Sequence, residues 1–223
     1  MATIVAFVAV VFGREPQRRP DTFSITGYVL DADGHLVLGA EVHARPSDRG
    51  GLESQSLTNL GRFNLSVNGP GRYLVYCFKD NRGYREIDEA LVRLDPEGIP
   101  TVVVTDQSPK AVTVIRLRPR AAKLTVRLID SETGRPLEKV QLKLRREHSP
   151  NDQFIKPLTA FHKNATIKLL LPSFPLRLSV SAAGYENWSY SDPSSEAPSA
   201  RLLLAPDEAR EITVALRPLR KPQ

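Results

Sequence analysis

Cysteine, histidine and tryptophan are scarce in this chain of 223 residues. It has one cysteine, Cys77, one tryptophan, and four histidines. A single cysteine excludes an internal disulfide and a zinc site made of several thiolates. Cys77 lies in the apolar run 73–78, so we interpret it as a small buried hydrophobic residue. No two histidines have a metal-binding spacing, and His35 and His43 are interpreted as surface residues.

A hydrophobic run long enough to cross a bilayer is also missing. The apolar segment 1–13 is too short for that, so no stable membrane span is predicted. It is typical of the core of a secretory signal, with cleavage after Gly13, although no basic residue precedes it. A buried first strand is the competing interpretation. We predict an exported protein (periplasmic, cell-surface or secreted) over a cytoplasmic one, with a charged linker at 14–21.

A strong excess of charge is absent from most of the chain. Residues 22–120 contain 12 basic and 12 acidic side chains, and residues 121–223 contain 16 and 11. Basic patches attract nucleic acids and other polyanions. No nucleic-acid recognition motif accompanies this excess, so we interpret it as a solvated strand face and tail and predict no nucleic-acid partner.

Short apolar segments separated by Gly, Pro, Asn and Asp make up the body of the chain. Alternation over five to seven residues is typical of β-strands. The segment 86–93 is compatible with a helical turn. Strands are expected at 24–30, 41–44, 62–67, 72–78, 111–117, 124–129, 140–145, 165–171, 176–182 and 212–216.

An internal repeat divides the chain. The segment ITGYVLDADGHLVLGAEV from Ile25 aligns with LTVRLIDSETGRPLEKVQL from Leu124, with one extra residue in the second turn. The segment AVTVIRLRPR from Ala111 aligns with EITVALRPLR from Glu211. Internal repeats set the domain count.

Each repeat is long enough to form its own sandwich. We therefore predict domains at 22–120 and 121–223. The connection at 118–122 is short, which predicts a restricted angle between them.

Three stretches of the first unit form a recognisable pattern. They are GYV at 27–29 with Asp31 and Gly34, GAEV at 39–42, and TNLGRFNL at 58–65 followed by PGRY at 70–73. On these residues the unit resembles the carboxypeptidase regulatory-like domain family, with Asn59 in place of the usual Asp. The second unit is more divergent, with GRPL at 134–137 and AGY at 183–185 but a degraded middle signature at 163–167.

The resemblance implies an all-β fold of two tandem prealbumin-like β-sandwiches of the Ig-like Greek-key type. In the first unit, Gly61 and Gly71 are expected at tight turns that need positive φ or close backbone approach. Phe63 and Tyr73 are expected to be core aromatics on adjacent strands.

Signals for catalysis are lacking. The chain has no G-x-S-x-G elbow, and its C-terminus LRKPQ lacks the Tyr-Arg-Gly-Ser ending of the hydroxyisourate hydrolases, which share the prealbumin-like fold. Asp31, Asp33 and Gly34 resemble the start of a calcium loop, but the further ligands are missing and a plain turn is favoured. We predict no enzyme activity, catalytic residue, metal or cofactor, and keep a hydroxyisourate-hydrolase-like enzyme as the least favoured alternative.

The strongest binding signal is the aromatic segment YENWSY at 185–190, with Tyr185, Trp188 and Tyr190. Exposed aromatic side chains stack on sugar rings or anchor protein partners. Packing of these side chains under the end of the sandwich is the favoured alternative.

Taken together, the sequence predicts a non-enzymatic, exported interaction or structural module of the cell envelope. Loops or sheet edges would contact a protein partner, in one version by pairing of an exposed edge strand. The alternative is a carbohydrate-binding module that uses Trp188 and Tyr190 to bind a polysaccharide of the envelope.

Overall fold

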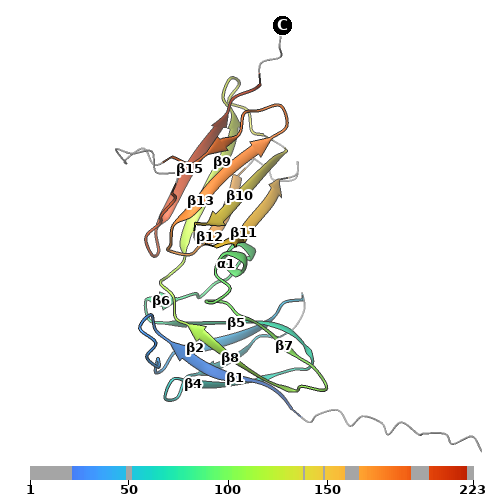
Figure 1. Ribbon diagram of the computed structural model, residues 1–223, viewed down its shortest axis with the longest axis vertical. Coiled ribbons are helices and arrows are strands. Elements are labelled where there is room, and N and C mark those ends of the chain that lie inside the picture. Colours follow the sequence, from blue (N-terminus) through green and yellow to red (C-terminus); the bar gives the residue numbers. More distant parts are fainter. Residues whose placement is uncertain are drawn as a thin grey trace, which may run out of the picture.

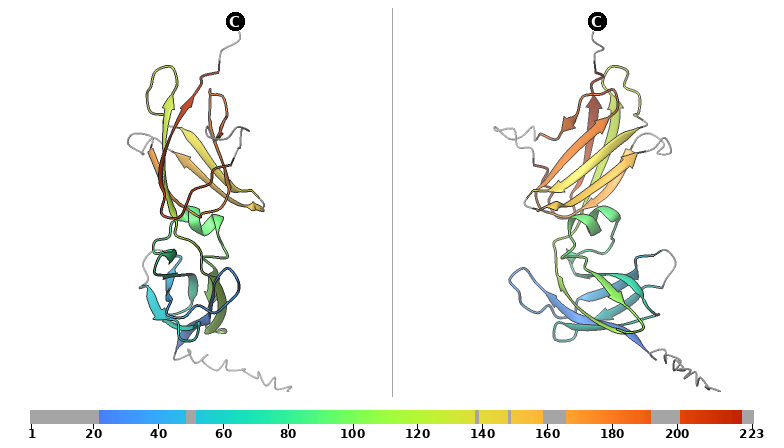
Figure 2. Two further views of the ribbon diagram at one scale, coloured as in Figure 1. Left: turned by 90° about the vertical axis from the view of Figure 1, so that its left-hand side faces the viewer. Right: turned by 45° about the vertical axis from the view of Figure 1, so that its right-hand side comes forward.

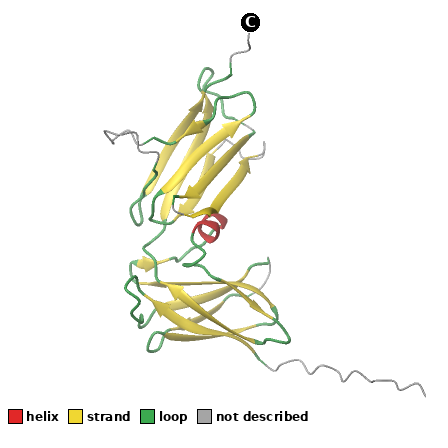
Figure 3. Ribbon diagram, in the orientation of Figure 1, coloured by secondary structure: helices red, strands yellow, loops and turns green. Residues whose placement is uncertain are grey.

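The computed structural model describes residues 22–48, 52–137, 139–147, 149–158, 166–191 and 201–219. These residues form mostly strands, with a single helix among them (Figure 3). The strands gather in two groups along the long axis of the molecule (Figure 1). We call residues 22–120 the N-terminal sandwich and residues 121–219 the C-terminal sandwich. The predicted signal-like segment 1–13 and linker 14–21 lie outside the described residues.

The N-terminal sandwich is built from two sheets. Its elements are β1 Phe23–Leu30, β2 Glu41–Pro46, β3 Ser54–Leu57, β4 Arg62–Val67, β5 Gly71–Lys79, β6 Arg82–Gly83, α1 Glu89–Leu94, β7 Thr101–Val104 and β8 Lys110–Arg116. One sheet has the order β4-β1-β8, in which β1 is antiparallel to β4 and parallel to β8. The other has the order β3-β2-β5-β6, and β7 also pairs with β5.

The C-terminal sandwich repeats this arrangement. Its strands are β9 Ala122–Asp130, β10 Val140–Arg146, β11 Ser149–Leu158, β12 Thr166–Leu171, β13 Leu176–Ala182, β14 Trp188–Ser189 and β15 Ala209–Leu216. Its two sheets have the orders β12-β9-β15 and β11-β10-β13-β14. As in the first sandwich, the first strand is antiparallel to one neighbour and parallel to the last strand. No helix of the described residues has the length and apolar character that a membrane span requires.

Alternation of apolar and polar residues explains why the sheets pack face to face. In β4 the side chains of Phe63, Leu65 and Val67 are buried, and the residues between them are exposed. They belong to one hydrophobic cluster with Val42 and Val75 of the facing sheet. Each such side chain contributes about 1.5–3 kcal/mol on burial. The predicted all-β sandwich fold is confirmed, whereas descent from one repeat and membership of the regulatory-like family stay predictions.

The strand registers correct one part of the repeat alignment. Ile25 of β1 lies opposite Ala111 of β8, and its repeat equivalent Leu124 of β9 lies opposite Arg210 of β15. Ala111 therefore corresponds to Arg210, and its predicted match with Glu211 is wrong by one residue. The error matters because a shift of one residue moves every side chain of a strand to the other face.

Every strand expected from the sequence is present, with ends that differ by a few residues at most. Five further strands were not predicted from the sequence: β3, β6, β7, β11 and β14. The strand β3 is polar, and β11 begins with Ser-Pro-Asn-Asp, which is typical of a turn. Helix α1 begins three residues later than the expected helical turn, because Asp88 is its N-cap.

Of the two glycines expected at tight turns, only one occupies a position that needs glycine. Gly61 has φ +73°, and a Cβ there would lie 2.5 Å from Cβ of Leu36, so the position needs glycine. Gly71 opens β5, and an added Cβ would meet only the Tyr73 ring at an ordinary 3.7 Å, so the expectation for Gly71 is wrong. Phe63 and Tyr73 are buried in the core, as predicted.

Candidate functional site

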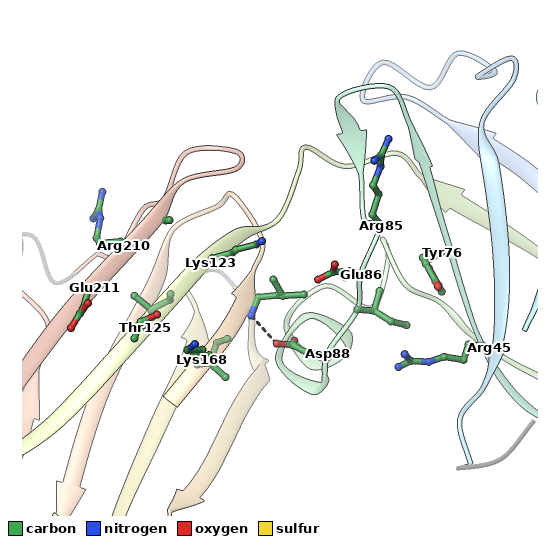
Figure 4. Close-up of a pocket in the computed structure, with 15 residues that line it drawn as sticks. Arg45, Tyr76, Arg85, Glu86, Asp88, Lys123, Thr125, Lys168, Arg210 and Glu211 are labelled. Atoms are coloured by element: carbon green, nitrogen blue, oxygen red, sulfur yellow. Dashed lines mark hydrogen bonds between the residues drawn. The ribbon is translucent and has the colours of Figure 1, made fainter. Parts of the chain in front are cut away.

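A cleft of about 880 Å³ lies where the two sandwiches meet (Figure 4). One wall is the outer face of the sheet β12-β9-β15, near the start of β9. The other wall comes from β2, β5 and the segment between β6 and α1. The volume is within the range of small-molecule sites, about 300–1,000 Å³.

Asp88 ties the two walls together at the start of α1. Its Oδ1 atom accepts a hydrogen bond of 2.9 Å from the backbone N–H of Leu91, which caps the helix. Its Oδ2 atom accepts one of 2.7 Å from the backbone N–H of Leu170 in β12, drawn as the dashed line in Figure 4. One carboxylate therefore starts the helix and holds it against the C-terminal sandwich.

The buried face of α1 is shared between the two sandwiches. Ala90 and Leu94 are fully buried and belong to the hydrophobic core cluster of the C-terminal sandwich. Leu91 packs with Tyr76 and Tyr84 in a separate cluster on the other side. Both views of Figure 2 place α1 between the two groups of strands. The helix, although part of the N-terminal sandwich by sequence, completes the core of its neighbour.

A buried ionic network fixes the other end of α1. Asp95, the C-cap residue, is fully buried and accepts two hydrogen bonds of 2.9 Å from the guanidinium of Arg118. The Tyr84 hydroxyl donates a third bond of 2.9 Å to the same carboxylate, and burial together with this carboxylate raises the pKa of Tyr84. Arg118 also donates to Glu97 at 2.7 Å, which lowers the pKa of Glu97. Because Arg118 begins the connection to β9, the network holds that connection against the helix.

The cleft has more cations than carboxylates free to neutralise them. Its lining holds three acidic residues, Glu86, Glu211 and Asp88, and the last of these accepts two backbone N–H groups. Arg210 is paired with Glu208 at 2.6 Å. Four further lining cations make no ion pair within the described part of the chain: Arg45, Arg85, Lys123 and Lys168.

His43 of β2 lies beside the cleft and is not the surface residue that the sequence predicts. Its side chain is 13% exposed, and its ring stacks on Tyr76 at 5.2 Å and on Phe78 at 5.4 Å. Its ring nitrogens lie 3.0 Å from Glu41 and 3.2 Å from Glu53. The Tyr76 hydroxyl donates to the same Glu53, and burial followed by this bond raises the pKa of Tyr76.

The aromatic residues predicted as a binding site lie elsewhere, on the C-terminal sandwich. Tyr190 is buried, and Trp188 packs edge-on against it with 6.4 Å between ring centroids. The Tyr185 hydroxyl donates a hydrogen bond of 2.8 Å to Asp130. All three side chains take part in or pack against the core of this sandwich, and a sugar-binding role for them stays a prediction.

The Asp31 segment forms a turn that its own hydrogen bonds account for. The Asp31 carboxylate accepts backbone N–H groups of His35 at 2.9 Å and Asp33 at 3.0 Å. The bond from His35 is the main cause that lowers the pKa of Asp31. These side chains gather closely enough to face one ion, yet the turn uses the carboxylate itself, so we assign no metal site.

Asp130 makes the equivalent turn in the C-terminal sandwich. Its carboxylate accepts the backbone N–H groups of Thr133 at 2.7 Å and Glu132 at 2.9 Å, besides the Tyr185 hydroxyl. The bond from Thr133, followed by that from Tyr185, lowers the pKa of Asp130. Both sandwiches therefore stabilise their first turn with an aspartate at the end of their first strand.

Replacement of Asp130 by asparagine is expected to change the pH dependence of stability. A carboxyl group whose pKa is lowered by folding stabilises the protein above its unfolded pKa of about 4, and this stabilisation is lost as the pH falls through the lower folded value. The difference in urea midpoint between wild type and Asp130→Asn should therefore be greatest near neutral pH and shrink below pH ~4. Exposed Glu132 offers a control, and Glu132→Gln should follow wild type throughout. A difference that stays constant with pH would contradict this role of Asp130.

Cys77 is 3% exposed within the core of the N-terminal sandwich. Burial raises the pKa of its thiol to about 12. A thiol in this environment stays protonated and inert. The interpretation of Cys77 as a small buried hydrophobic residue is confirmed.

Among the comparisons with known proteins, only the one with solved structures finds matches. No family model matches the chain, and no curated protein matches it. The TIE protein of Bacillus anthracis aligns with 89% of this chain at 13% identity and a TM-score of 0.36. The shaft pilin SpaA from Lactobacillus rhamnosus GG aligns with 91% of this chain and 100% of its own at 9% identity and a TM-score of 0.31.

A dioxygenase is similar over a smaller part. The 3-chlorocatechol 1,2-dioxygenase from Rhodococcus opacus 1CP aligns with 45% of this chain and 61% of its own at 11% identity and a TM-score of 0.35. This chain spans about a third of the TIE protein, 34% of its length. Likenesses at these scores carry no conclusion about activity or partners.

Proposed function

We propose that this chain is a non-enzymatic, exported module that holds two β-sandwiches in a fixed arrangement and presents their junction to a partner at the cell envelope. The observation that supports this is the burial of Ala90 and Leu94 of α1 in the core of the C-terminal sandwich. The apolar segment 1–13 supports the exported location.

The contacts at the junction are of the kind that restrict motion. Neighbouring domains move relative to one another unless the interface between them is large and hydrophobic. Here the helix contributes apolar side chains to the neighbouring core, and Asp88 adds a hydrogen bond to Leu170. At the other end of the helix, the buried pair of Asp95 and Arg118 holds the connecting chain. A module with such a junction acts as a rigid spacer and gives its surfaces a constant geometry.

Small-angle X-ray scattering of the full chain tests the fixed arrangement. We expect the curve from the two sandwiches to fit one relative orientation, and Ala90→Glu, which places a charge in the shared core, to broaden the distribution of distances. Arg93→Ala, on the exposed face of the same helix, is the matched control and should leave the curve unchanged. If the wild-type scattering curve can be fitted only with many relative orientations of the two sandwiches, the proposal of a rigid spacer is wrong. Fractionation of cells that express the full chain checks the exported location separately.

A further inference from the structure

Two lysines of the C-terminal sandwich share one face of the cleft. Lys123 of β9 lies opposite Leu170 of β12, and Lys168 of β12 lies opposite Thr125 of β9. Both lysine side chains are exposed on the outer face of the sheet and line the cleft. Diagonal neighbours in such a pair of strands have backbones about 7–8 Å apart, so two long side chains at these positions can reach the same ligand.

The fold itself does not call for these lysines. When the two sandwiches are matched by their strand registers, Lys123 corresponds to Ser24 of β1 and Lys168 to Asn64 of β4. The same positions in the N-terminal sandwich are thus filled by small or uncharged polar residues. The positive charge is particular to the sandwich whose outer face forms the cleft.

The facing wall adds two guanidinium groups. Arg45 comes from β2 and Arg85 from the segment between β6 and α1, and Figure 4 shows both on the opposite side of the cleft from Lys123 and Lys168. Arg85 lies over the ring of Phe78 at 5.1 Å, which leaves its N–H groups available. Guanidinium groups suit planar or tetrahedral oxyanions because they donate two parallel hydrogen bonds.

We propose that the cleft binds a small polyanion that carries at least two oxyanion groups, carboxylate or phosphate, and bridges the two walls. The two walls share the ligand, with Lys123 and Lys168 on one side and Arg45 and Arg85 on the other. A cleft with low-dielectric walls and an excess of one charge concentrates ligands of the opposite charge. The site rests on the proposed function, because both walls keep their spacing only if the two sandwiches are held in a fixed arrangement.

Isothermal titration calorimetry with two probes tests the site, tripolyphosphate for phosphate and trigalacturonate for carboxylate on a sugar. We expect saturable 1:1 binding of at least one probe by the full chain. The double variants Lys123→Gln/Lys168→Gln and Arg45→Gln/Arg85→Gln should each weaken it by at least about tenfold. Binding of only one probe identifies the source of the oxyanion.

The matched control removes the same charge from another basic surface. Lys143 and Arg145 lie on the outer face of β10 and line a separate groove. The variant Lys143→Gln/Arg145→Gln should bind the probes within about twofold of wild type, whereas an equal loss would show a response to net charge alone and overturn the proposal. Absence of binding to both probes would overturn it as well.

Small-angle scattering from the same samples separates this proposal from the proposed function. A chain that keeps one relative orientation of its sandwiches but binds neither probe would refute the ligand site and leave the rigid spacer in place.

Discussion

The variant Asp95→Ala is expected to lose about 3 kcal/mol of unfolding free energy. The carboxylate is fully buried and accepts three hydrogen bonds, two from Arg118 and one from Tyr84. Its removal leaves the buried Tyr84 hydroxyl without its acceptor and Arg118 with Glu97 alone. An uncompensated charge and a buried unpaired hydroxyl both destabilise the folded state.

Urea denaturation followed by circular dichroism measures this loss. Glu97→Gln is the matched control, because Glu97 binds the same guanidinium from a side chain that is 61% exposed. Exposed ion pairs contribute less than about 1 kcal/mol, so this variant should unfold close to wild type. Equal losses for the two variants would mean that burial of Asp95 does not set the strength of the network.

The variant Leu94→Ala is expected to lose about 2–5 kcal/mol and to uncouple the unfolding of the two sandwiches. Leu94 is fully buried, and its contacts belong to the core of the sandwich that follows it in the chain. Truncation leaves a cavity between α1 and that core. Because the helix is the main apolar contact across the junction, the single transition expected of the wild type should separate into two.

Differential scanning calorimetry distinguishes coupled from independent unfolding. Arg93→Ala changes the neighbouring exposed position of α1 and should shift stability by less than about 0.5 kcal/mol. A Leu94→Ala variant that melts in one transition, as stable as Arg93→Ala, would contradict the role given to the helix.

Strands with regular alternation or a long apolar run could be predicted from the sequence, whereas short or polar strands were missed. The strand β4 has buried Phe63, Leu65 and Val67 at every second position, and its predicted bounds are those observed. The strand β3, Ser-Gln-Ser-Leu, has no apolar alternation and is held at the sheet edge by its register with β2. The alignment of the two repeats is wrong in β15 because the apolar residues of this strand can be matched to those of β8 in two registers. The pairing of β15 with β9 selects one of them.

The candidate site depends on contacts between residues far apart in the chain. Alternation in β9 places Lys123 on an outer face, but nothing local shows that a cleft forms there. The hydrogen bond from Leu170 to Asp88 joins positions 82 residues apart, and Arg118 is 23 residues from Asp95. The lone Trp188, in contrast, gave a conspicuous local signal, and the structure packs it against a core.

The parallel pairing of the first and last strands also determines how the molecule would carry tension. In each sandwich the chain begins in β1 or β9 and leaves through β8 or β15, whose direction is the same. A force that pulls these ends apart acts along the strands and shears the evenly spaced hydrogen bonds between them. The whole ladder from Ser24–Lys110 to Leu30–Arg116 is then loaded at once, and the bonds cannot open one by one. Because the two sandwiches are linked in series, each would carry the full force, and extension of the chain would require one of these two ladders to break as a whole.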